Sequence, residues 1–382
     1  MLTDVSLHLS GDRFQVTYRL TGNEAEARAK AEDICVEQTI EFPAELVPEG
    51  DIRSQIMGRI ESLQLIKPGF YRALISYPIE ITSFELTQLI NVIFGNISIK
   101  PGIRVEQVDL PPALLEAFEG PRFGQDGLRA LLGVAKRPLL ATALKPMGLS
   151  PAQLADQAYR CAVGGIDMIK DDHGLTNQAF SAYRERVEQC AEAVARANRE
   201  TGFKCIYAPN VTAPADQVVD RALWARNAGA GGLLVVPGLI GLDTMRLLAD
   251  DDRIGLPVLS HPAFQGSYVV NPDQGVSHYV LFGQFNRLAG ADVTIFPNYG
   301  GRFSFTMEEC QDVVAGASVP MGHIEPIFPA PAGGMTVERV PDMLKVYGRE
   351  VVFLIGGGLH KRGPDLIANS RYFRELVEQM AA

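Results

Sequence analysis

The chain has 382 residues, of which 47% are hydrophobic and 21% are charged, and its formal net charge at neutral pH is −10. A chain of this length and composition can bury a large core, and about two or three domains are expected. The acidic balance and the lack of a basic run make double-stranded nucleic acid and acidic membranes poor partners for the surface as a whole, while a local cationic pocket for a small anion stays open.

Cysteine usage and the N-terminal sequence predict a soluble cytoplasmic protein. The five cysteines are scattered and form no C-x-x-C pair, which fits a reducing compartment and argues against a disulfide scaffold or a cysteine zinc site. The sequence MLTDVSLHLS lacks a charged segment followed by an apolar one, so no signal peptide is expected. No apolar stretch reaches the roughly 18–20 residues that span a bilayer.

Residues 1–125 are predicted to form an N-terminal α+β domain of the ferredoxin-like kind. Three segments alternate apolar and polar residues as strands do, and two helix-like segments lie among them. In chain order these segments are 12–20, 23–39, 69–79, 85–95 and 98–110. Strands and helices mixed over about 120 residues favour a small α+β sandwich.

The sequence pattern changes near residue 125, and the new pattern predicts a (β/α)8 barrel, the TIM barrel, over residues 126–382. Eight short apolar runs without alternation follow, most of them succeeded by a helix-like segment. The runs are 137–145, 164–172, 203–210, 231–238, 256–262, 291–298, 325–334 and 351–358. Such runs are typical of parallel strands buried on both faces, and eight β–α units in about 250 residues match the size of this barrel.

Polar residues at the carboxyl ends of these strands should meet at one mouth of the barrel, where such barrels carry their chemistry. Lys145 ends the first strand, residues 170–173 (KDDH) end the second, and His261 ends the fifth. So many polar strand ends favour an enzyme over a scaffold. Lys145 is a candidate to protonate or polarise an enolate, and His261 to transfer protons or bind a hydroxyl. A rim lysine and a structural histidine are the alternatives.

The cluster Lys170-Asp171-Asp172-His173 is the strongest candidate for a metal site. Successive strand residues point to opposite faces, so Lys170 and Asp172 share a side and His173 starts the loop. A protonated amine is not a metal ligand, but a neutral lysine takes up CO2 to form a carbamate that ligates through oxygen. Carbamate, carboxylate and one further ligand would hold a hard divalent ion such as Mg²⁺. A salt-bridge cluster at the barrel rim is the alternative.

Glycines close the last two strands and predict a phosphate site. Gly333-Gly334 follow the seventh strand, and a run of three glycines that includes Gly357 and Gly358 follows the eighth. In (β/α)8 barrels this corner commonly binds phosphate through backbone N–H groups. Glycine also ends strands for steric reasons alone, which is the alternative.

These segments resemble the RuBisCO superfamily. GGIDMIKDDH is similar to the family segment G-G-x-D-x-x-K-D-D-E, whose lysine is carbamylated and binds magnesium. RPLLATALKPMGLS resembles the first-strand segment of the family, residues 94–124 resemble the bridge from its N-terminal domain, and AGG at 332–334 and FLIGGGLHKRGP resemble its two phosphate loops.

The resemblance implies a cofactor set and an assembly. It implies Mg²⁺, or Mn²⁺ or another divalent ion, held by Lys170, Asp172 and His173, with CO2 bound as a carbamate on Lys170. It implies a homodimer in which the N-terminal domain covers the barrel mouth of a second subunit. Glu37 and Asn96 would then contribute to substrate binding, and no nucleic acid or membrane partner is expected.

Departures from the family pattern argue against carbon fixation. Met147 stands where carboxylating members have a second lysine, Pro262 where they have a phosphate-binding arginine, and His173 where they have a glutamate ligand. The segment IFPNYGGRFSF contains no CO2-orienting lysine, and Arg302 is its candidate cation. A charge-assisted hydrogen bond contributes on the order of 1.5–3 kcal/mol, so a second substrate phosphate would be held poorly. A RuBisCO-like protein of the type that does not fix CO2 is expected.

The expected reaction is metal-assisted enolisation of a phosphorylated keto sugar or sugar acid, by a lyase or an isomerase. Asn96 stands where the enolases of the group carry a lysine base, and the loop typical of methylthioribulose-phosphate isomerases is missing. The resemblance then favours decarboxylation, or carboxyl transfer followed by hydrolysis, of a β-keto sugar-acid phosphate of the 3-oxo-isoapionate 4-phosphate type. An isomerase or enolase (tautomerase) acting on a methylthio-sugar phosphate of methionine salvage, and a non-catalytic sugar-phosphate-binding protein, are the alternatives.

Overall fold

The computed structural model describes residues 6–47, 49–303 and 305–381. These residues form two compact units. The first unit extends to Glu119 and also contains Gln265–Gln284 and Pro320–Ile324, while the second contains the rest of the chain. Among the described residues, no helix combines the length and the apolar character that crossing a bilayer requires.

The first unit is built on a five-stranded sheet in the order β10-β4-β1-β3-β2. Its strands are β1 (Arg13–Thr21), β2 (Arg59–Lys67), β3 (Phe70–Pro78), β4 (Ile103–Asp109) and β10 (Gly275–Val276). Pairing is antiparallel except between β10 and β4. On β1, Phe14, Val16, Tyr18 and Leu20 are fully buried and alternate with partly exposed residues, because successive side chains point to opposite faces.

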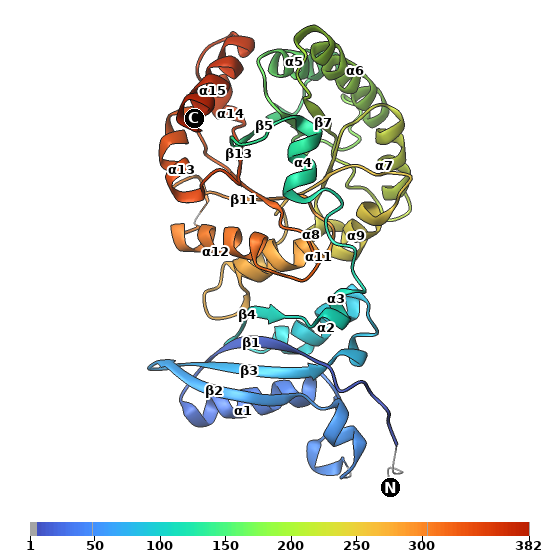
Figure 1. Ribbon diagram of the computed structural model, residues 1–382, viewed down its shortest axis with the longest axis vertical. Helices are drawn as coiled ribbons and strands as arrows, with labels where there is room; N and C mark the ends of the chain where they lie inside the picture. Colours follow the sequence, from blue (N-terminus) through green and yellow to red (C-terminus); the bar gives the residue numbers. More distant parts are fainter. Residues whose placement is uncertain (1–5, 48, 304, 382) are drawn as a thin grey trace. The chain divides into compact units, whose positions relative to one another are not determined.

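Helices in the first unit cover the buried face of this sheet. Helix α1 (Glu24–Glu37) packs on β1, β2 and β3 (Figure 1). Its buried residues Ala27, Ala31 and Ile34 recur at helical spacing. The helix begins after Asn23, whose side chain accepts a hydrogen bond from the Glu26 N–H group. The remaining helices of this unit are α2 (Leu86–Phe94), α3 (Pro112–Leu115) and α10 (Gly266–Val269).

The second unit is a (β/α)8 barrel, and each of its strands falls within one of the eight predicted runs. The strands are β5 (Leu139–Leu144), β6 (Met168–Asp171), β7 (Ile206–Ala208), β8 (Leu233–Val235), β9 (Val258–Ser260), β11 (Val293–Pro297), β12 (Phe328–Ala332) and β13 (Val352–Leu354). They pair in parallel in the orders β13-β5-β6-β7 and β12-β11-β9-β8. A parallel bridge between Asn210 and Leu234 joins β7 to β8, and β12 packs beside β13, so the barrel closes.

Helices surround the barrel strands (Figure 1). They are α4 (Gly124–Leu132), α5 (Pro151–Val163), α6 (Tyr183–Thr201), α7 (Val218–Asn227), α8 (Pro237–Ile240), α9 (Leu242–Asp250), α11 (Asn286–Leu288), α12 (Met307–Ser318), α13 (Val340–Tyr347), α14 (Gly357–His360) and α15 (Leu366–Ala381). As the sequence predicts, α5 begins with Ser150 as N-cap and Pro151 at the first position. Ser150 and Gln153 form a capping box there.

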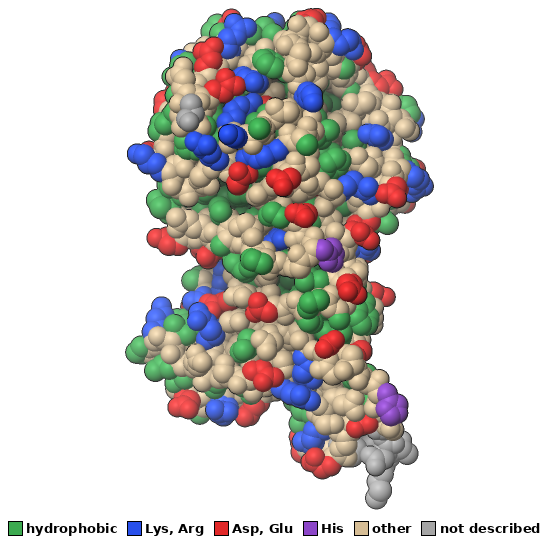
Figure 2. Space-filling model, viewed as in Figure 1, with side chains coloured by type: hydrophobic (Ala, Val, Ile, Leu, Met, Phe, Trp, Pro, Cys, Tyr) green, Lys and Arg blue, Asp and Glu red, His purple; other side chains and the backbone are tan. Residues whose placement is uncertain are grey.

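The barrel interior is a continuous apolar core that fixes the strand ends. Buried residues from all eight strands form one cluster, which includes Leu139, Met168, Ile206, Leu259 and Phe328. The surface of the molecule is charged, and Figure 2 shows basic, acidic and hydrophobic side chains intermixed on the face viewed. All five cysteines are free and buried.

Candidate functional site

Lys145 and Asp172 form an ion pair where two neighbouring barrel strands end. The Nζ atom of Lys145, just after β5, lies 2.7 Å from Oδ2 of Asp172, just after β6. Gln157 on α5 holds the Lys145 backbone at both polar groups. Its Nε2 donates to the Lys145 carbonyl at 2.7 Å, and its Oε1 accepts from the Lys145 N–H at 3.3 Å. Lys145 therefore has a fixed backbone and a specific partner, unlike a rim lysine that reaches only water.

Lys170 is buried in the barrel, with a relative exposure of 3%. Its Nζ atom donates a hydrogen bond to the Asp171 carbonyl at 3.1 Å. Burial disfavours the ammonium form and lowers the pKa of Lys170 to about 8; the positive charge of Lys145 lowers it further, while Asp172 acts in the opposite direction. A substantial fraction of the amine is therefore neutral near physiological pH, and a neutral amine is the form that takes up CO2.

Asp172 remains a carboxylate throughout the physiological range. Burial by itself would raise the pKa of Asp172, but contacts with His173 and Lys145 and the charge of Lys170 outweigh it and hold the pKa below its ordinary value. The Nδ1 atom of the neighbouring residue His173 lies 3.4 Å from Asp172 Oδ1. The site thus keeps one permanent anionic oxygen donor between two lysines.

His173 and His261 stack on one another although they follow different strands. Their ring centroids are 4.5 Å apart and their planes differ by 15°. His261 Nδ1 accepts a hydrogen bond from the Ala263 N–H at 3.2 Å, which assigns the proton of the neutral ring to Nε2. Burial lowers the pKa of His261 well below its ordinary value, and the charges of Lys170 and His173 act in the same direction. His261 is therefore a neutral imidazole with one N–H donor.

The donor set fits a divalent ion only with a modified lysine. Within residues 6–47, 49–303 and 305–381, no group of three or more His, Cys, Asp and Glu side chains is arranged to hold a metal ion. Asp172 and His173 are adjacent and could supply an oxygen and a nitrogen, and the carbamate form of Lys170 would be the third protein ligand. The lowered pKa of this buried amine suits that modification, and the set of donors is compatible with Mg²⁺ or Mn²⁺.

Glycine turns follow β12 and β13 in the conformation that an anion cradle needs. Gly333 and Gly334 have φ values of +77° and +95°, which other residues adopt only with strain. In the described part of the chain, no protein acceptor occupies the backbone N–H groups of these two glycines or of Gly357 and Gly358. Unpaired backbone N–H groups at a barrel mouth are available to an anionic ligand.

The turn after β13 lies beside Lys145. A Cβ atom added at Gly356 would be 3.4 Å from Lys145 Cε, whereas one added at Gly357 would meet nothing within 4 Å. The lysine at the end of the first barrel strand and the glycines at the end of the last one are therefore neighbours. Gly357 has open space above its backbone, as a ligand cradle requires.

Arg302 lies in the loop after β11, which packs on the turn at Gly333 and Gly334. A Cβ atom at Gly334 would be 3.1 Å from the Arg302 backbone nitrogen, and one at Gly301 would be 2.1 Å from the Gly333 carbonyl oxygen. The Arg302 guanidinium is exposed and lies 5.6 Å from the centroid of the Phe303 ring. The structure thus brings the backbone of Arg302 next to the first glycine turn.

Glu37 and Asn96 contact each other within the first unit. The Nδ2 atom of Asn96 donates to Glu37 Oε1 at 3.0 Å and to Glu41 Oε2 at 3.3 Å. These three residues line a small polar pocket of about 130 Å³. The two sequence-predicted residues of the first unit therefore form one local cluster.

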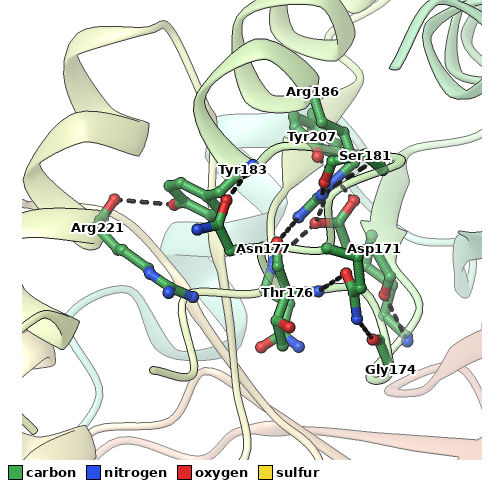
Figure 3. Close-up of polar contacts among 12 residues, drawn as sticks. Asp171, Gly174, Thr176, Asn177, Ser181, Tyr183, Arg186, Tyr207 and Arg221 are labelled. Carbon is green, nitrogen blue, oxygen red and sulfur yellow. Dashed lines mark hydrogen bonds and ion pairs between the residues drawn. The ribbon is translucent and has the colours of Figure 1, made fainter. Parts of the chain in front are cut away.

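A buried network centred on Asp171 and Arg186 was not expected from sequence. Asp171 is fully buried on the side of β6 opposite to Lys170 and Asp172, and its carboxylate accepts a hydrogen bond from the Asn210 N–H. Asp171 also contacts Arg186 and Tyr207 (Figure 3). The position of Asp171 in the charged segment is its only sequence signal. Arg186 and Tyr207 read as ordinary members of a helix and a strand.

The chain folds as a (β/α)8 barrel with Lys145 and Lys170 at the carboxyl ends of neighbouring strands, and comparison with known proteins identifies its family. The model of the ribulose bisphosphate carboxylase large chain, catalytic domain, matches residues 125–371. The chain belongs to the RuBisCO large-chain family, and the resemblance seen in the sequence is confirmed.

Similar proteins include RuBisCO-like proteins and an isomerase. A ribulose bisphosphate carboxylase-like protein 1 from Rhodopseudomonas palustris is 39% identical, and the match covers 96% of this chain and 98% of that protein. A 5-methylthioribulose-1-phosphate isomerase from Rhodospirillum rubrum is 37% identical over 91% of each chain. The crystal structure of a RuBisCO-like protein from Rhodopseudomonas palustris superimposes with a TM-score of 0.88 at 36% identity, covering 97% of this chain and 99% of that one.

Proposed function

We propose that this protein is a RuBisCO-like enzyme that enolises a phosphorylated keto sugar and does not fix CO2. The observation that carries the proposal is Lys170, a buried lysine with a pKa of about 8 in the segment that also holds Asp172 and His173. A buried amine of this kind is rare in a purely structural role, because burial of an ionisable group is costly. The N–H groups of the glycine turns, which have no protein acceptor among the described residues, would supply the anion site that a sugar phosphate needs.

Metal and phosphate binding orient the substrate in this proposal. Lys170 in its carbamate form, Asp172 and His173 would hold a divalent ion. When bound, such an ion supplies Lewis-acid stabilisation of negative charge on a substrate oxygen. The N–H groups of Gly333, Gly334, Gly357 and Gly358 bind the substrate phosphate, with Arg302 as an additional cation next to the first turn.

Two lysines are assigned to the proton transfers and one histidine to holding a substrate hydroxyl. As a carbamate, Lys170 would supply the oxygen base for the proton on the substrate carbon. Lys145 returns a proton to the enolate from Nζ, since its pairing with Asp172 at 2.7 Å fixes the ammonium group. His261 holds a substrate hydroxyl by a hydrogen bond donated from Nε2–H, since Nδ1 accepts from the Ala263 N–H and the lowered pKa keeps the ring neutral. Positioned acid–base groups of this kind typically contribute about 10²–10⁴-fold to a rate.

A methylthio-sugar phosphate isomerisation is the first reaction to test. The Rhodospirillum rubrum relative carries the name of such an isomerase and matches 91% of this chain. An isomerisation needs a proton taken from one carbon and returned to its neighbour, which Lys170 and Lys145 can perform from adjacent strands. Decarboxylation of a β-keto sugar-acid phosphate, the reaction favoured by the sequence, passes through the same kind of enolate and is the second candidate. For both candidate reactions, carboxylation is not expected, because Pro262 and Met147 stand where carboxylating members of the family have an arginine and a lysine.

The test is a substrate panel in deuterated water with Mg²⁺ and bicarbonate. The probes are 5-methylthioribulose 1-phosphate, 3-oxo-isoapionate 4-phosphate and ribulose 1,5-bisphosphate, and NMR follows deuterium uptake and product formation. The proposal predicts deuterium uptake at the carbon next to the keto group of at least one monophosphate. It predicts no carboxylated product from the bisphosphate.

Two outcomes would contradict the proposal. Net carboxylation of ribulose 1,5-bisphosphate would show that the missing cations are not required. Thermal stabilisation by a monophosphate without deuterium uptake or turnover would instead indicate a non-catalytic sugar-phosphate-binding protein.

A further inference from the structure

Strand β6 carries a buried arginine–aspartate pair at each end. At its start, Arg137 Nη1 and Nη2 contact the two carboxylate oxygens of Asp167 at 2.7 and 2.8 Å. At its end, Arg186 Nε contacts Asp171 Oδ2 at 3.2 Å. Both pairs are nearly or fully removed from solvent. Buried pairs contribute little net stability, because desolvation offsets most of their attraction. Stability alone therefore does not explain why two such pairs lie at the two ends of one four-residue strand, and each pair needs an explanation of its own.

The pair at the start of β6 has a local structural role. Asp167 Oδ2 also accepts the Leu140 N–H at 2.8 Å, and Arg137 Nη1 also donates to the Pro138 carbonyl at 2.8 Å. These bonds tie β5 to β6 at the end of the barrel opposite to the glycine turns. None of them involves a residue of the candidate site.

The pair at the end of β6 anchors the segment that carries the candidate ligands. Besides Arg186, the Asp171 carboxylate accepts the Tyr207 hydroxyl at 2.7 Å and the Asn210 N–H at 3.1 Å. Asp171 lies between Lys170 and Asp172 and points to the opposite side of the strand. Three donors thus hold the carboxylate of the residue between the two site residues, and Figure 3 shows Arg186 and Tyr207 at Asp171.

The same network holds the loop that begins with Asp172 and His173. Arg186 donates from Nη2 to the Thr176 carbonyl at 2.6 Å and from Nη1 to the Ser181 carbonyl at 2.7 Å. Asn210 donates from Nδ2 to the His173 carbonyl at 2.9 Å. One fully buried guanidinium therefore connects the strand end to two points of the loop at residues 172–181, and Asn210 fixes a third.

We infer that Asp171 and Arg186 are positioning residues that set the geometry of Lys170, Asp172 and His173 for ligand binding. The inference rests on the proposed function, since it assigns the network to the proposed metal site. Asp171 itself does not face that site, so it acts through the backbone it anchors. Side chains that orient metal ligands typically change metal affinity by about 10–100-fold when they are removed.

The matched pair at the other end of β6 makes a sharp test possible. The variants are Asp171→Asn and, as control, Asp167→Asn, each of which removes the carboxylate charge nearest to one buried arginine, although Arg137 also lies 3.6 Å from Glu378 through its Nε atom. The measurements on the full chain are Mn²⁺ titration by electron paramagnetic resonance with bicarbonate present, thermal unfolding, and amide hydrogen exchange of residues 172–181. Tyr207→Phe is a milder third variant, which removes one hydrogen bond to Asp171 and leaves both charges paired.

Both aspartate variants should lower the unfolding temperature, but only Asp171→Asn should weaken Mn²⁺ binding, by at least about tenfold. Asp171→Asn should also raise exchange at residues 172–181 by at least about tenfold, and Tyr207→Phe should change both quantities in the same direction by a smaller factor. Equal Mn²⁺ affinities and equal loop exchange in the two aspartate variants would overturn the inference.

Failure of the proposed function gives a different pattern. Absence of Mn²⁺ binding by the unmodified protein would contradict the proposed metal site. The exchange data then decide the inference by themselves: selective loosening of residues 172–181 in Asp171→Asn supports the positioning role, and uniform loosening contradicts it. If Asp171→Asn does not fold, Tyr207→Phe decides, and unchanged Mn²⁺ affinity and loop exchange in that variant overturn the inference.

Discussion

His173 stacks on His261 with ring centroids 4.5 Å apart, so the residue in place of the family's glutamate ligand touches the residue proposed to hold a substrate hydroxyl. A glutamate at position 173 would supply a harder, anionic donor in the same place. In the proposed metal site the histidine would instead supply a nitrogen donor, and its ring lies against the neutral imidazole of His261. The departure from the family pattern thus changes the surroundings of His261 and would change the ligand set.

Replacing His173 with glutamate should strengthen Mg²⁺ binding. A carboxylate oxygen suits Mg²⁺ better than an imidazole nitrogen, so His173→Glu should tighten Mg²⁺ binding on the order of tenfold. Isothermal titration calorimetry with bicarbonate present measures the change. His323→Gln, in the first unit, is the control and should leave Mg²⁺ affinity as it is. An unchanged or weaker affinity in His173→Glu would argue that residue 173 is not a ligand.

Removing the Lys145 amine should impair proton transfer without unfolding the protein. Lys145→Met should slow product formation about 100-fold or more. Its unfolding temperature should stay close to that of the unmodified protein, since a partly exposed ion pair contributes roughly 0–1 kcal/mol. Lys136→Met is the matched control, because Lys136 is exposed and precedes the same strand β5 that Lys145 follows. Equal rates in the two variants would remove Lys145 from the mechanism.

Carbamate formation on Lys170 should follow the pKa of a buried amine. Since burial lowers this pKa to about 8, the neutral fraction rises about tenfold per pH unit below pH 8 and levels off above it. Because the neutral amine is the form that attacks CO2, the initial rate of carbamate formation at a fixed concentration of dissolved ¹³CO2 should rise in the same way, with Lys170→Met as the blank. An initial rate that still rises tenfold per unit above pH 9 would indicate an ordinary exposed lysine.

The same lowered pKa predicts how stability depends on pH. Between about pH 8 and the ordinary lysine pKa of 10.5, the unfolded chain binds a proton at Lys170 that the folded chain does not. The Lys170 contribution to the free energy of unfolding therefore increases with pH in this window, and the cost of burying the cation is fully present below it. Denaturant unfolding across pH 7.5–10 measures the free energies of unfolding of the unmodified protein and of Lys170→Met. A difference between the two free energies that stays constant with pH would contradict the burial of Lys170.

A methyl group at Gly357 should block phosphate without disturbing the fold. Nothing lies within 4 Å of a Cβ atom at this position, so Gly357→Ala should change the free energy of unfolding by less than about 1 kcal/mol. Loss of a charge-assisted hydrogen bond should weaken binding of inorganic phosphate by about tenfold or more. Gly266→Ala is the control, because Gly266 also opens a four-residue helix and also has open space. Unchanged phosphate binding in Gly357→Ala would place the anion elsewhere.

Strong local patterns made the barrel predictable from sequence. All eight barrel strands are buried on both faces and read as apolar runs, and their carboxyl ends carry Lys145, Lys170, His261 and the glycine turns. Strand β2 was not predicted, because it lies at the sheet edge and most of its residues are at least partly exposed, so alternation is weak. The short strand β10 joins the first unit from residues 275–276, which no local pattern could indicate.

The supporting residues of the candidate site could not be predicted for a different reason. Arg186, Tyr207 and Asn210 reach Asp171 from later elements of the chain, so their role depends on three-dimensional placement. Gln157 likewise contacts Lys145 from helix α5, where a glutamine reads as an ordinary surface residue. The stacking of His173 on His261 joins the ends of two strands that are not adjacent in the barrel.

Deuterium uptake by a substrate in the presence of Lys170→Met tests the central role of Lys170 most directly. With 5-methylthioribulose 1-phosphate, Mg²⁺ and bicarbonate in deuterated water, the unmodified protein should exchange the proton next to the keto group. Lys170→Met should slow this exchange by at least about 100-fold, while Lys136→Met, a change at an exposed lysine outside the candidate site, should retain it. Exchange by Lys170→Met at the rate of the unmodified protein would contradict the account.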